Sequence, residues 1–393
     1  MEALGRHEKH FWPSEPEAYG SARRGGTYRA FVPAPIGEMS FSFTDQAAHA
    51  LSAAATALAR LGEDPPRLSR LGSIAQNLLR SESVASSRIE GVAISHKRLA
   101  RAEYQGSRRG DAKAAEVLGN VEAMRRAIAL GAEGRPFTVE DVLEIHRTLL
   151  RHDERGIAGV VRDKQNWIGG NDYNPVGATY VPPPPAYVPA LLEDLCRFVE
   201  RRDLPPVAQA AIVHAQFENI HPFADGNGRT GRALIYATLR RTDGLRDYVP
   251  PISLVLAAEP KTYVSGFGAY SAGDVSAWCA TFADATTRAA AAARRFAEDI
   301  ERLQREWLER LGNPRSDATV RELVAALPEQ PVVDVVAGQR LTGKSHVAVG
   351  NAIAQLADAG ILVPLNERKW GRAWECDDLL ELVDRFERSV ATP

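Results

Sequence analysis

A chain of 393 residues is long enough for two or three domains, each with its own buried core. The composition, 45% hydrophobic and 25% charged, is that of an ordinary globular protein, and a formal net charge of −2 gives no overall basic field for nucleic acid or anionic lipid. The sequence shows no secretory leader and no apolar run of about 18 residues that could span a membrane. Its three cysteines are widely spaced and do not suggest disulfides. These features predict a cytoplasmic protein that does not enter a membrane.

The first 40 residues are rich in Pro and Gly, and we expect them to form an irregular arm over the body of the protein. Helical periodicity begins at Thr44 or Asp45, either of which can cap a helix, and a second helix would end at Gly91. The expected helices are 44–61, 68–88, 111–131, 138–151 and 206–220, followed by more up to about residue 312. The Gly312-Asn313-Pro314 sequence would stop the last of them.

Residues 155–185 separate two of these helices and are dense in Gly, Asn and Pro. Short β-like pieces flank the turns of this segment, which predicts a β-hairpin.

Residues 338–345, GQRLTGKS, match the phosphate-binding P-loop pattern. A P-loop needs a parallel sheet built from βα units, and the last 78 or so residues show no such series. They show instead three helices, 320–327, 332–339 and 346–360, followed by two short strands around a charged turn. This pattern predicts a winged helix and makes the P-loop match a coincidence.

The predicted winged helix carries basic residues where DNA phosphates would lie: Lys344, His346, Arg368, Lys369 and Arg372. However, residues 316–393 contain eight Lys or Arg and twelve Asp or Glu, a net charge of −4. Because phosphate neutralisation dominates DNA affinity, docking of a protein is at least as good an interpretation as DNA binding.

Residues 221–232, HPFADGNGRTGR, lie between two predicted helices. Their three glycines let the backbone approach a ligand closely and turn its N–H groups towards one point. The second helix starts here, so its free N–H groups and its dipole attract an anion. Arg229 and Arg232 are on one helix face and suit phosphate oxygens, while Asp225 suits Mg²⁺. The segment therefore predicts a phosphate and metal site, with His221 beside it as a base.

The same segment resembles the signature of the Fic family, H-P-F-x-[DE]-G-N-G-R-x-x-R, at every defined position. The resemblance implies an all-helical core that transfers AMP from ATP to a protein hydroxyl. His221 would be the general base, and Asp225 would bind Mg²⁺ at the α- and β-phosphates. The implied nucleotide-binding positions of the signature are Gly226, Asn227, Gly228, Arg229, Thr230, Gly231 and Arg232.

Within this set the resemblance implies two functions. Asn227 and the amides of Gly226 and Gly228 would form an anion hole, and Arg229 and Arg232 would hold the outer phosphates.

The resemblance extends to two further segments. Residues 177–185 resemble the family's flap, the edge along which a target segment aligns, which would place Ala178, Thr179 and Tyr180 beside nucleotide and target. Residues 261–274 resemble the stretch that closes over adenine, which would place Tyr263 and Ser271 there, although Tyr263 fits a core position equally well. His214, in contrast, is expected to be a packed histidine.

SSRIEG at 86–91 resembles the family's inhibitory motif [ST]-x-x-x-E-[GN], with Ser86, Glu90 and Gly91 at the defined positions. A carboxylate at a helix end can pair with Arg232, which then cannot hold the γ-phosphate of ATP. The alternative is a solvated glutamate at an ordinary helix end.

The sequence thus predicts an all-α Fic-type bundle with a β-hairpin flap, an N-terminal inhibitory region and a C-terminal winged helix. The expected domains are an arm and inhibitory region (1–110), a Fic catalytic core (111–290), a linker helix (291–315) and a winged-helix domain (316–393).

The expected function is a self-inhibited protein adenylyltransferase that modifies Ser, Thr or Tyr hydroxyls of protein targets and of itself, with ATP as substrate and Mg²⁺ as cofactor. Two alternatives stay open: an enzyme that removes AMP at the same site, and a DNA-binding regulator whose core senses a nucleotide. The sequence also leaves open whether the chain forms a homodimer.

Overall fold

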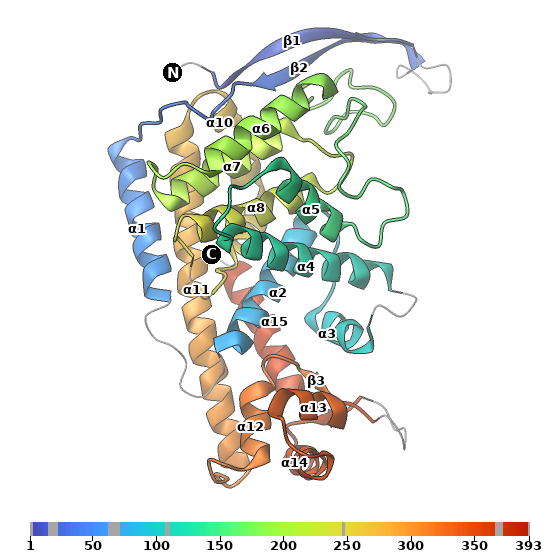
Figure 1. Cartoon of the computed structure of the whole chain (residues 1–393), viewed down its shortest axis with the longest axis vertical. Helices are drawn as coiled ribbons and strands as arrows, with labels where there is room; N and C mark the ends of the chain where they lie inside the picture. Colours follow the sequence, from blue (N-terminus) through green and yellow to red (C-terminus); the bar gives the residue numbers. More distant parts are fainter. Residues whose placement is uncertain are drawn as a thin grey trace. The chain divides into compact units, whose positions relative to one another are not determined.

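Helices dominate the structure, a computed structural model that describes residues 3–14, 23–61, 71–106, 111–245, 248–365 and 372–391 (Figure 1). The helices are α1 (Asp45–Leu61), α2 (Leu71–Ile89), α3 (His96–Gln105), α4 (Ala112–Ala132), α5 (Val139–Leu149), α6 (Val188–Val199), α7 (Pro206–Ile220), α8 (Asn227–Arg241), α9 (Ile252–Ala258), α10 (Pro260–Ser271), α11 (Val275–Arg310), α12 (Thr319–Ala326), α13 (Val335–Thr342), α14 (His346–Asp358) and α15 (Asp377–Ala391), with a 3₁₀ turn η2 (Pro185–Tyr187). The strands are β1 (Gly5–Trp12), β2 (Gly26–Pro33), β3 (Val332–Val333), β4 (Val363–Pro364) and β5 (Trp374–Glu375). The predicted helical fold class is confirmed.

Local capping explains where the predicted helices begin and end. The Thr44 hydroxyl accepts a hydrogen bond from the Ala47 amide at 3.3 Å at the start of α1. Helix α2 stops shortly before Gly91, whose φ of +81° lies in the left-handed region. Asn313 is likewise left-handed just after α11, as the Gly-Asn-Pro break predicted.

The described chain forms two units that alternate along the sequence. Unit 1 comprises 1–55, 122–244 and 259–284, and unit 2 comprises 56–121, 245–258 and 285–393. The domain borders expected from the sequence, at 110, 290 and 315, do not coincide with borders between these units and stay predictions. Among the helices described, none is long and apolar enough to cross a bilayer, and the compartment of the protein stays a prediction.

Helix α7 forms the centre of unit 1. Nearly every residue of α7 is buried, and the helix contacts α6, α8, α10 and β2. Its buried polar side chains Gln209, His214, Gln216 and Asn219 are hydrogen-bonded within the core. Gly231 of α8 allows close packing, since a Cβ there would lie 2.7 Å from the Glu218 carboxylate on α7. The two helices that flank the 221–226 loop are therefore firmly packed.

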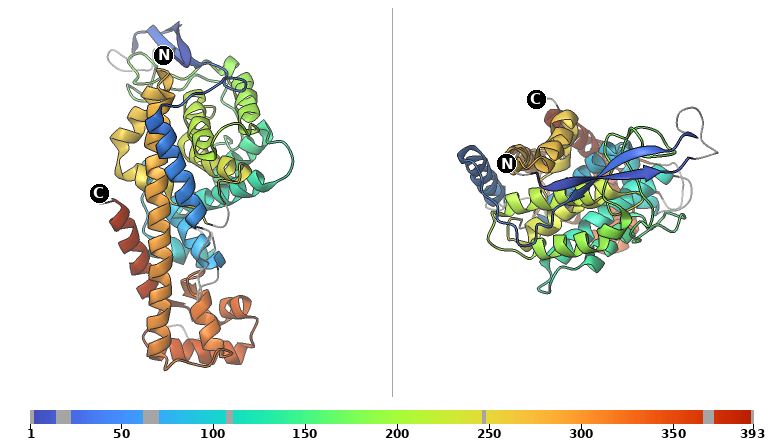
Figure 2. Two further views of the ribbon diagram at one scale, coloured as in Figure 1. Left: turned by 90° about the vertical axis from the view of Figure 1, so that its left-hand side faces the viewer. Right: turned by 90° about the horizontal axis from the view of Figure 1, so that it is seen from above.

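The N-terminal segment is not the irregular arm that the sequence predicted. Strands β1 and β2 pair antiparallel from Gly5–Pro33 to Trp12–Gly26 and form a long hairpin (blue in Figures 1 and 2). Within unit 1, the Phe31 amide donates to the Val181 carbonyl at 2.8 Å. The expectation failed because strand pairing depends on partners about 20 residues apart rather than on local composition.

In unit 2, residues 319–376 give three helices and a small antiparallel sheet of order β3-β5-β4. Helices α12, α13 and α14 pack against one another (orange in Figure 2). Val332 and Val333, predicted to be helical, instead form β3, and Asp334 caps α13. The name winged helix stays a prediction, and Arg368 and Lys369 of its expected wing lie outside the described residues.

The P-loop match does not form a phosphate cradle. Residues 338–342 belong to α13, and Ser345 caps α14 through a bond from the Ala348 amide at 3.3 Å. The ammonium of Lys344 lies 2.9 Å from the Glu322 carboxylate. GQRLTGKS is therefore a helix–turn–helix connection, as the sequence argument expected.

Candidate functional site

A short loop, residues 221–226, connects α7 to α8 in unit 1. His221 follows α7 in a left-handed conformation, with φ 49° and ψ 60°, and Gly226 precedes α8 with φ 78°. The two unusual residues reverse the chain at both ends of the loop. The His221 side chain is 16% exposed, and its Nδ1 lies 3.9 Å from Oε2 of Glu218. The imidazole is thus partly accessible, in a loop whose Pro222 and Phe223 are buried and whose Ala224 is exposed.

The Asn227 side chain holds the loop rather than pointing to solvent. Its Oδ1 accepts from the Phe223 amide at 2.8 Å, and its Nδ2 donates to the Phe223 carbonyl at 2.8 Å. Asn227 is buried, so these bonds are shielded from water. The sequence predicted that Asn227 belongs to an anion hole. Its carboxamide instead bonds the loop, so only the backbone N–H of Asn227, at the start of α8, could serve an anion there.

Arg162 supports the same loop from the preceding segment, a contact that no sequence pattern predicted. Its Nε donates to the His221 carbonyl at 2.8 Å and one terminal nitrogen donates to the Pro183 carbonyl at 2.6 Å. The backbone amide of Arg162 donates to the Pro222 carbonyl at 3.0 Å. Burial lowers the pKa of Arg162 to about 10. A lone arginine in a Gly-rich connection looks solvated in sequence, so no local signal identified it.

His146 of α5 is a second support that the sequence did not reveal. The Gly159 amide donates to its Nδ1 at 2.9 Å, so the proton is on Nε2, which donates to the Asp225 carbonyl at 2.9 Å. The ring also stacks on Phe223, with centroids 3.6 Å apart. Burial lowers the pKa of His146 to about 4. A neutral imidazole therefore connects the two sides of the loop.

The Asp225 carboxylate lies at the exposed side of the loop. Its Oδ1 accepts from the Gly226 amide at 2.6 Å and lies 3.4 Å from Arg229, while Oδ2 is 2.6 Å from Arg155. Burial alone would raise the pKa of Asp225, but the hydrogen bond from Arg155 and the charge of Arg229 hold it below its usual value. The carboxylate is thus ionised at neutral pH and suits a hard cation.

The two arginines of the motif lie deeper than a solvated phosphate clamp would suggest. Arg229 is 3% exposed and Arg232 is 1% exposed, whereas Gly228 between the loop and Arg229 is partly exposed. A buried guanidinium is costly unless charge compensates it, and Arg229 lies 3.4 Å from the Asp225 carboxylate. Binding of the outer phosphates by the two arginines stays a prediction. Thr230 and Gly231 are buried on the same helix.

The segment predicted as a β-hairpin flap is reduced to a single antiparallel bridge between Ile168 and Tyr180. Gly, Asn and Pro residues prevent longer pairing on either side. The Tyr180 hydroxyl donates to the Asn219 carbonyl at 2.7 Å, which ties the bridge to the end of α7. Thr179 is exposed and Ala178 is half-buried, so both are accessible beside the bridge.

Tyr263 and Ser271, predicted to lie over adenine, are both on α10. Tyr263 is 5% exposed, and its hydroxyl is 2.7 Å from Nε2 of His214 within a cluster that includes Trp278. His214 is fully buried, and its pKa is lowered to about 3 by burial, as expected of a packed histidine. The Ser271 hydroxyl oxygen accepts a hydrogen bond from the side-chain Nδ2 of Asn219 at 3.0 Å. Tyr263 is thus in a core environment, and Ser271 lies next to the end of α7.

The segment predicted to be inhibitory belongs to unit 2. Ser86 is buried on α2, Glu90 is exposed directly after the helix, and Gly91 turns the chain. The Gly91 amide donates to the Arg88 carbonyl at 3.0 Å. Glu90 thus presents its carboxylate at the C-terminal end of α2.

Comparisons with known proteins match the part of the chain that contains this loop. Residues 136–239 match the Fic/DOC family, and residues 48–129 match the N-terminal region of the Fic/DOC family. A curated relative from Drosophila ananassae, "Protein adenylyltransferase Fic", is 32% identical over 151 residues, which is 38% of this chain and 28% of that protein. The protein of the same name from Drosophila yakuba is 30% identical over 176 residues, 44% of this chain and 32% of its own length. The chain therefore matches only about a third of the length of these relatives.

Solved structures show the same fold. A Fic family protein from Desulfovibrio desulfuricans G20 has a TM-score of 0.53 at 20% identity, with 86% of this chain and 97% of that chain covered. Fic-1 from C. elegans has a TM-score of 0.50 at 20% identity, with 65% and 73% covered.

The shifted pKa of His146 makes stability depend on pH. In the unfolded chain this histidine takes up a proton below about pH 6.5, whereas in the folded chain it does so only near pH 4. The unfolded state thus binds more protons between these values, so stability is lost as the pH falls. We expect the free energy of unfolding to drop by about 2 kcal/mol from this group between pH 7.5 and 5.

Urea unfolding at both pH values checks this expectation. His146→Gln should lose less stability than the wild type on acidification, and an equal loss in the two proteins would contradict the assignment.

Proposed function

Over residues 48–129 and 136–239 the chain belongs to the Fic/DOC family, and on that premise we propose that it is a protein adenylyltransferase. It would transfer AMP from ATP to a Ser, Thr or Tyr hydroxyl of a protein target, and to its own hydroxyls. The curated relatives that carry this activity in their names support the proposal. The observation that carries it is the combination of a near-surface imidazole, an ionised carboxylate and a helix N-terminus around one six-residue loop.

The loop suits the phosphates of ATP. The free N–H groups at the start of α8 and the helix dipole attract negative charge at one point. Asn227 and Arg162 fix the backbone there through side-chain bonds, so little rearrangement is needed when phosphate binds. Arg229 and Arg232, both on α8, would add positive charge for the outer phosphates.

His221 would act as the general base. Its imidazole takes the proton of the target hydroxyl, whose oxygen then attacks the α-phosphorus of ATP. A bond forms between this oxygen and the α-phosphorus, the bond from the α-phosphorus to the bridging oxygen breaks, and pyrophosphate leaves. Glu218, 3.9 Å from Nδ1 of His221, would stabilise the protonated imidazole.

Mg²⁺ fits the donors at this site. Magnesium bound to a nucleotide needs one or two carboxylates, with the other positions filled by phosphates and water. The ionised Asp225 supplies one, and among the described residues no group of three His, Cys, Asp or Glu forms a metal cage of its own. Held by Asp225, the ion would neutralise part of the charge of the bound phosphates. Arg155 lies 2.6 Å from Oδ2 of Asp225 and would compete with such an ion for this oxygen.

A brake at Glu90 completes the proposal. The exposed carboxylate at the end of α2, in the pattern Ser86, Glu90, Gly91, would pair with Arg232 and compete with the γ-phosphate. Thr179 and Ala178, which are accessible beside the flap bridge, would align the target.

His221→Ala should abolish AMP transfer and leave ATP binding nearly unchanged, because it removes the base but not the phosphate-binding amides. A general base contributes about 10²- to 10⁴-fold. Transfer is measured with α-labelled ATP and binding by calorimetry. Labelling at the wild-type rate would contradict the role of His221.

Arg155→Ala should tighten binding of Mn²⁺, used as a probe for Mg²⁺, to the complex with a non-hydrolysable ATP analogue. Arg155 competes for Asp225, but its side chain is 58% exposed, so the gain is at most about fivefold. Electron paramagnetic resonance reports the free Mn²⁺. Arg151→Ala, a neighbouring exposed arginine that does not contact Asp225, should change nothing. Unchanged Mn²⁺ affinity in Asp225→Asn would show that this carboxylate is not a ligand.

Glu90→Gly should raise automodification and target labelling about tenfold or more, because a charge-assisted pair worth about 1.5–3 kcal/mol no longer competes with ATP. The gain should vanish in Glu90→Gly combined with Arg232→Ala. Equal labelling of wild type and Glu90→Gly would make Glu90 an ordinary solvated helix end. If wild type strips AMP from a modified target and Glu90→Gly does not, the protein removes AMP instead.

A further inference from the structure

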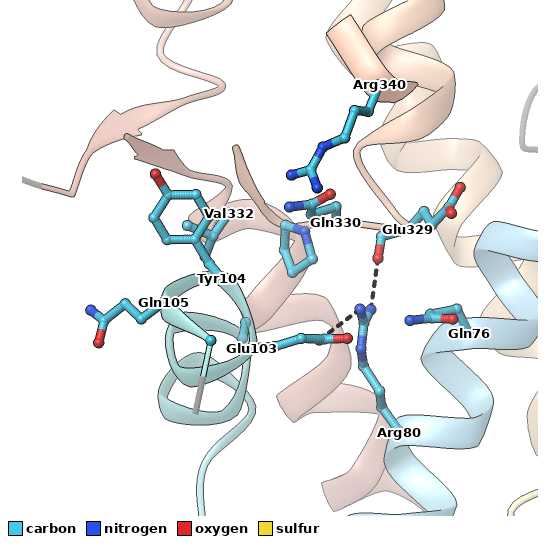
Figure 3. Close-up of a pocket in the computed structure, with 12 residues that line it drawn as sticks. Gln76, Arg80, Glu103, Tyr104, Gln105, Glu329, Gln330, Val332 and Arg340 are labelled. Atoms are coloured by element: carbon cyan, nitrogen blue, oxygen red, sulfur yellow. Dashed lines mark hydrogen bonds and ion pairs between the residues drawn. The ribbon is translucent and has the colours of Figure 1, made fainter. Parts of the chain in front are cut away.

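A polar cavity lies within unit 2, away from the residues used above (Figure 3). It measures about 480 Å³, within the range of about 300–1,000 Å³ typical of small-molecule sites. Helices α2 and α3 form one side, and residues 329–332 with α13 form the other.

One wall of the cavity is fixed by Arg80 of α2. Arg80 is 6% exposed; one of its terminal nitrogens donates to the Glu329 carbonyl at 2.9 Å, and the other lies 2.8 Å from the Glu103 carboxylate. Both bonds are visible in Figure 3. They connect α2, α3 and the segment before β3, and they neutralise the charge of Glu103.

A second guanidinium enters the cavity from α13. Arg340 points towards the side chain of Gln330 (Figure 3). Within the described part of the chain, Arg340 makes no ion pair or hydrogen bond. Glu103 is engaged by Arg80, and the carboxylate of Glu329 points away from Arg80 in Figure 3. Arg340 is exposed, so its guanidinium lies at the open side of the cavity, where a ligand from solvent can reach it.

The remaining walls suit the body of an organic molecule. The Tyr104 hydroxyl donates to the Asp334 carboxylate at 2.8 Å, which fixes the ring at one side. Buried Val332 provides an apolar surface next to it, and the amides of Gln330 and Gln76 can donate or accept hydrogen bonds. A few polar groups around a partly apolar wall are typical of sites that orient a small ligand.

We propose that this cavity binds a small organic oxyanion, a molecule with a phosphate or carboxylate group that pairs with Arg340 while its remaining atoms contact Gln330, Tyr104 and Val332. Guanidinium groups bind both kinds of oxyanion through paired N–H donors. The ligand would join α13 to α2 and α3, since the cavity has walls from all three.

The position of the cavity gives the ligand a regulatory effect. Helix α2 contributes Gln76 and Arg80 to the cavity and ends at the 86–91 segment. A ligand that stabilises α2 therefore acts on the brake; this consequence rests on the proposed function, whereas binding itself does not.

Calorimetry of the full-length protein with inorganic phosphate and with citrate tests the proposal. Two variants target the cavity: Arg340→Gln removes the charge, and Gln330→Glu places a carboxylate beside Arg340 and occupies the site from within. Each variant should weaken binding of whichever anion the wild type binds, phosphate or citrate, about tenfold or more. Arg315→Gln, an exposed arginine outside the cavity, is the matched control and should bind like wild type.

The probes and variants separate the outcomes. Binding of citrate, phosphate or both that is lost in the two cavity variants supports the proposal and identifies the favoured oxyanion. Phosphate binding that is lost only in Arg229→Ala belongs to the loop at α8. If neither anion binds, or both cavity variants bind both anions like wild type, the proposal is wrong. Hydrogen exchange gives a further check, since the anion should slow exchange of the α2 amides even in an inactive His221→Ala background.

Discussion

The 221–226 loop is fixed from within by the carboxamide of Asn227, which bonds both the amide and the carbonyl of Phe223. These two bonds close the loop against the first turn of α8. The loop contains two residues with left-handed backbone conformation, His221 and Gly226. For His221 this conformation is unfavourable and needs such support from the surrounding structure. The closed loop carries His221 at its start and Asp225 just before the first residue of α8.

Support for this loop comes mainly from bonds to backbone carbonyls. Arg162 and His146 donate to the carbonyls of His221 and Asp225, and Asn166 donates to that of Phe223 at 2.9 Å. These bonds fix the loop backbone, and the first N–H groups of a helix have no partner within the helix, so those of α8 would be available to a ligand. A preorganised site of this kind binds charge without a reorganisation cost at the moment of reaction. The buried, neutral His146 contributes only above its acidic pKa range, so the loop depends on pH.

Sequence patterns predicted the parts of this molecule that depend on neighbouring residues. The ends of α1, α2 and α11 follow from Thr44, Gly91 and Asn313, and the signature at 221–232 contains its own loop and helix start. Features that join distant residues were missed. Arg162 bonds a carbonyl 59 residues away and His146 bonds one 79 residues away.

Strand pairing shows the same limit. The β1–β2 hairpin and the pairing of Val332 with Glu375 both need a partner strand that local composition does not specify. Pro- and Gly-rich composition suggested an irregular N-terminus, and a short apolar run at 332–333 suggested a helix. Tertiary partners decided both segments.

Calorimetric titration of ATP into Asn227→Ala tests most directly whether the loop is a preformed phosphate site. Loss of two bonds of about 1 kcal/mol each should weaken ATP binding about tenfold or more, while circular dichroism shows that the helices remain. Asn351→Ala, an exposed asparagine on α14, should bind ATP like wild type. If folded Asn227→Ala binds ATP as tightly as wild type, the loop is not the phosphate site and the account of the active centre is wrong.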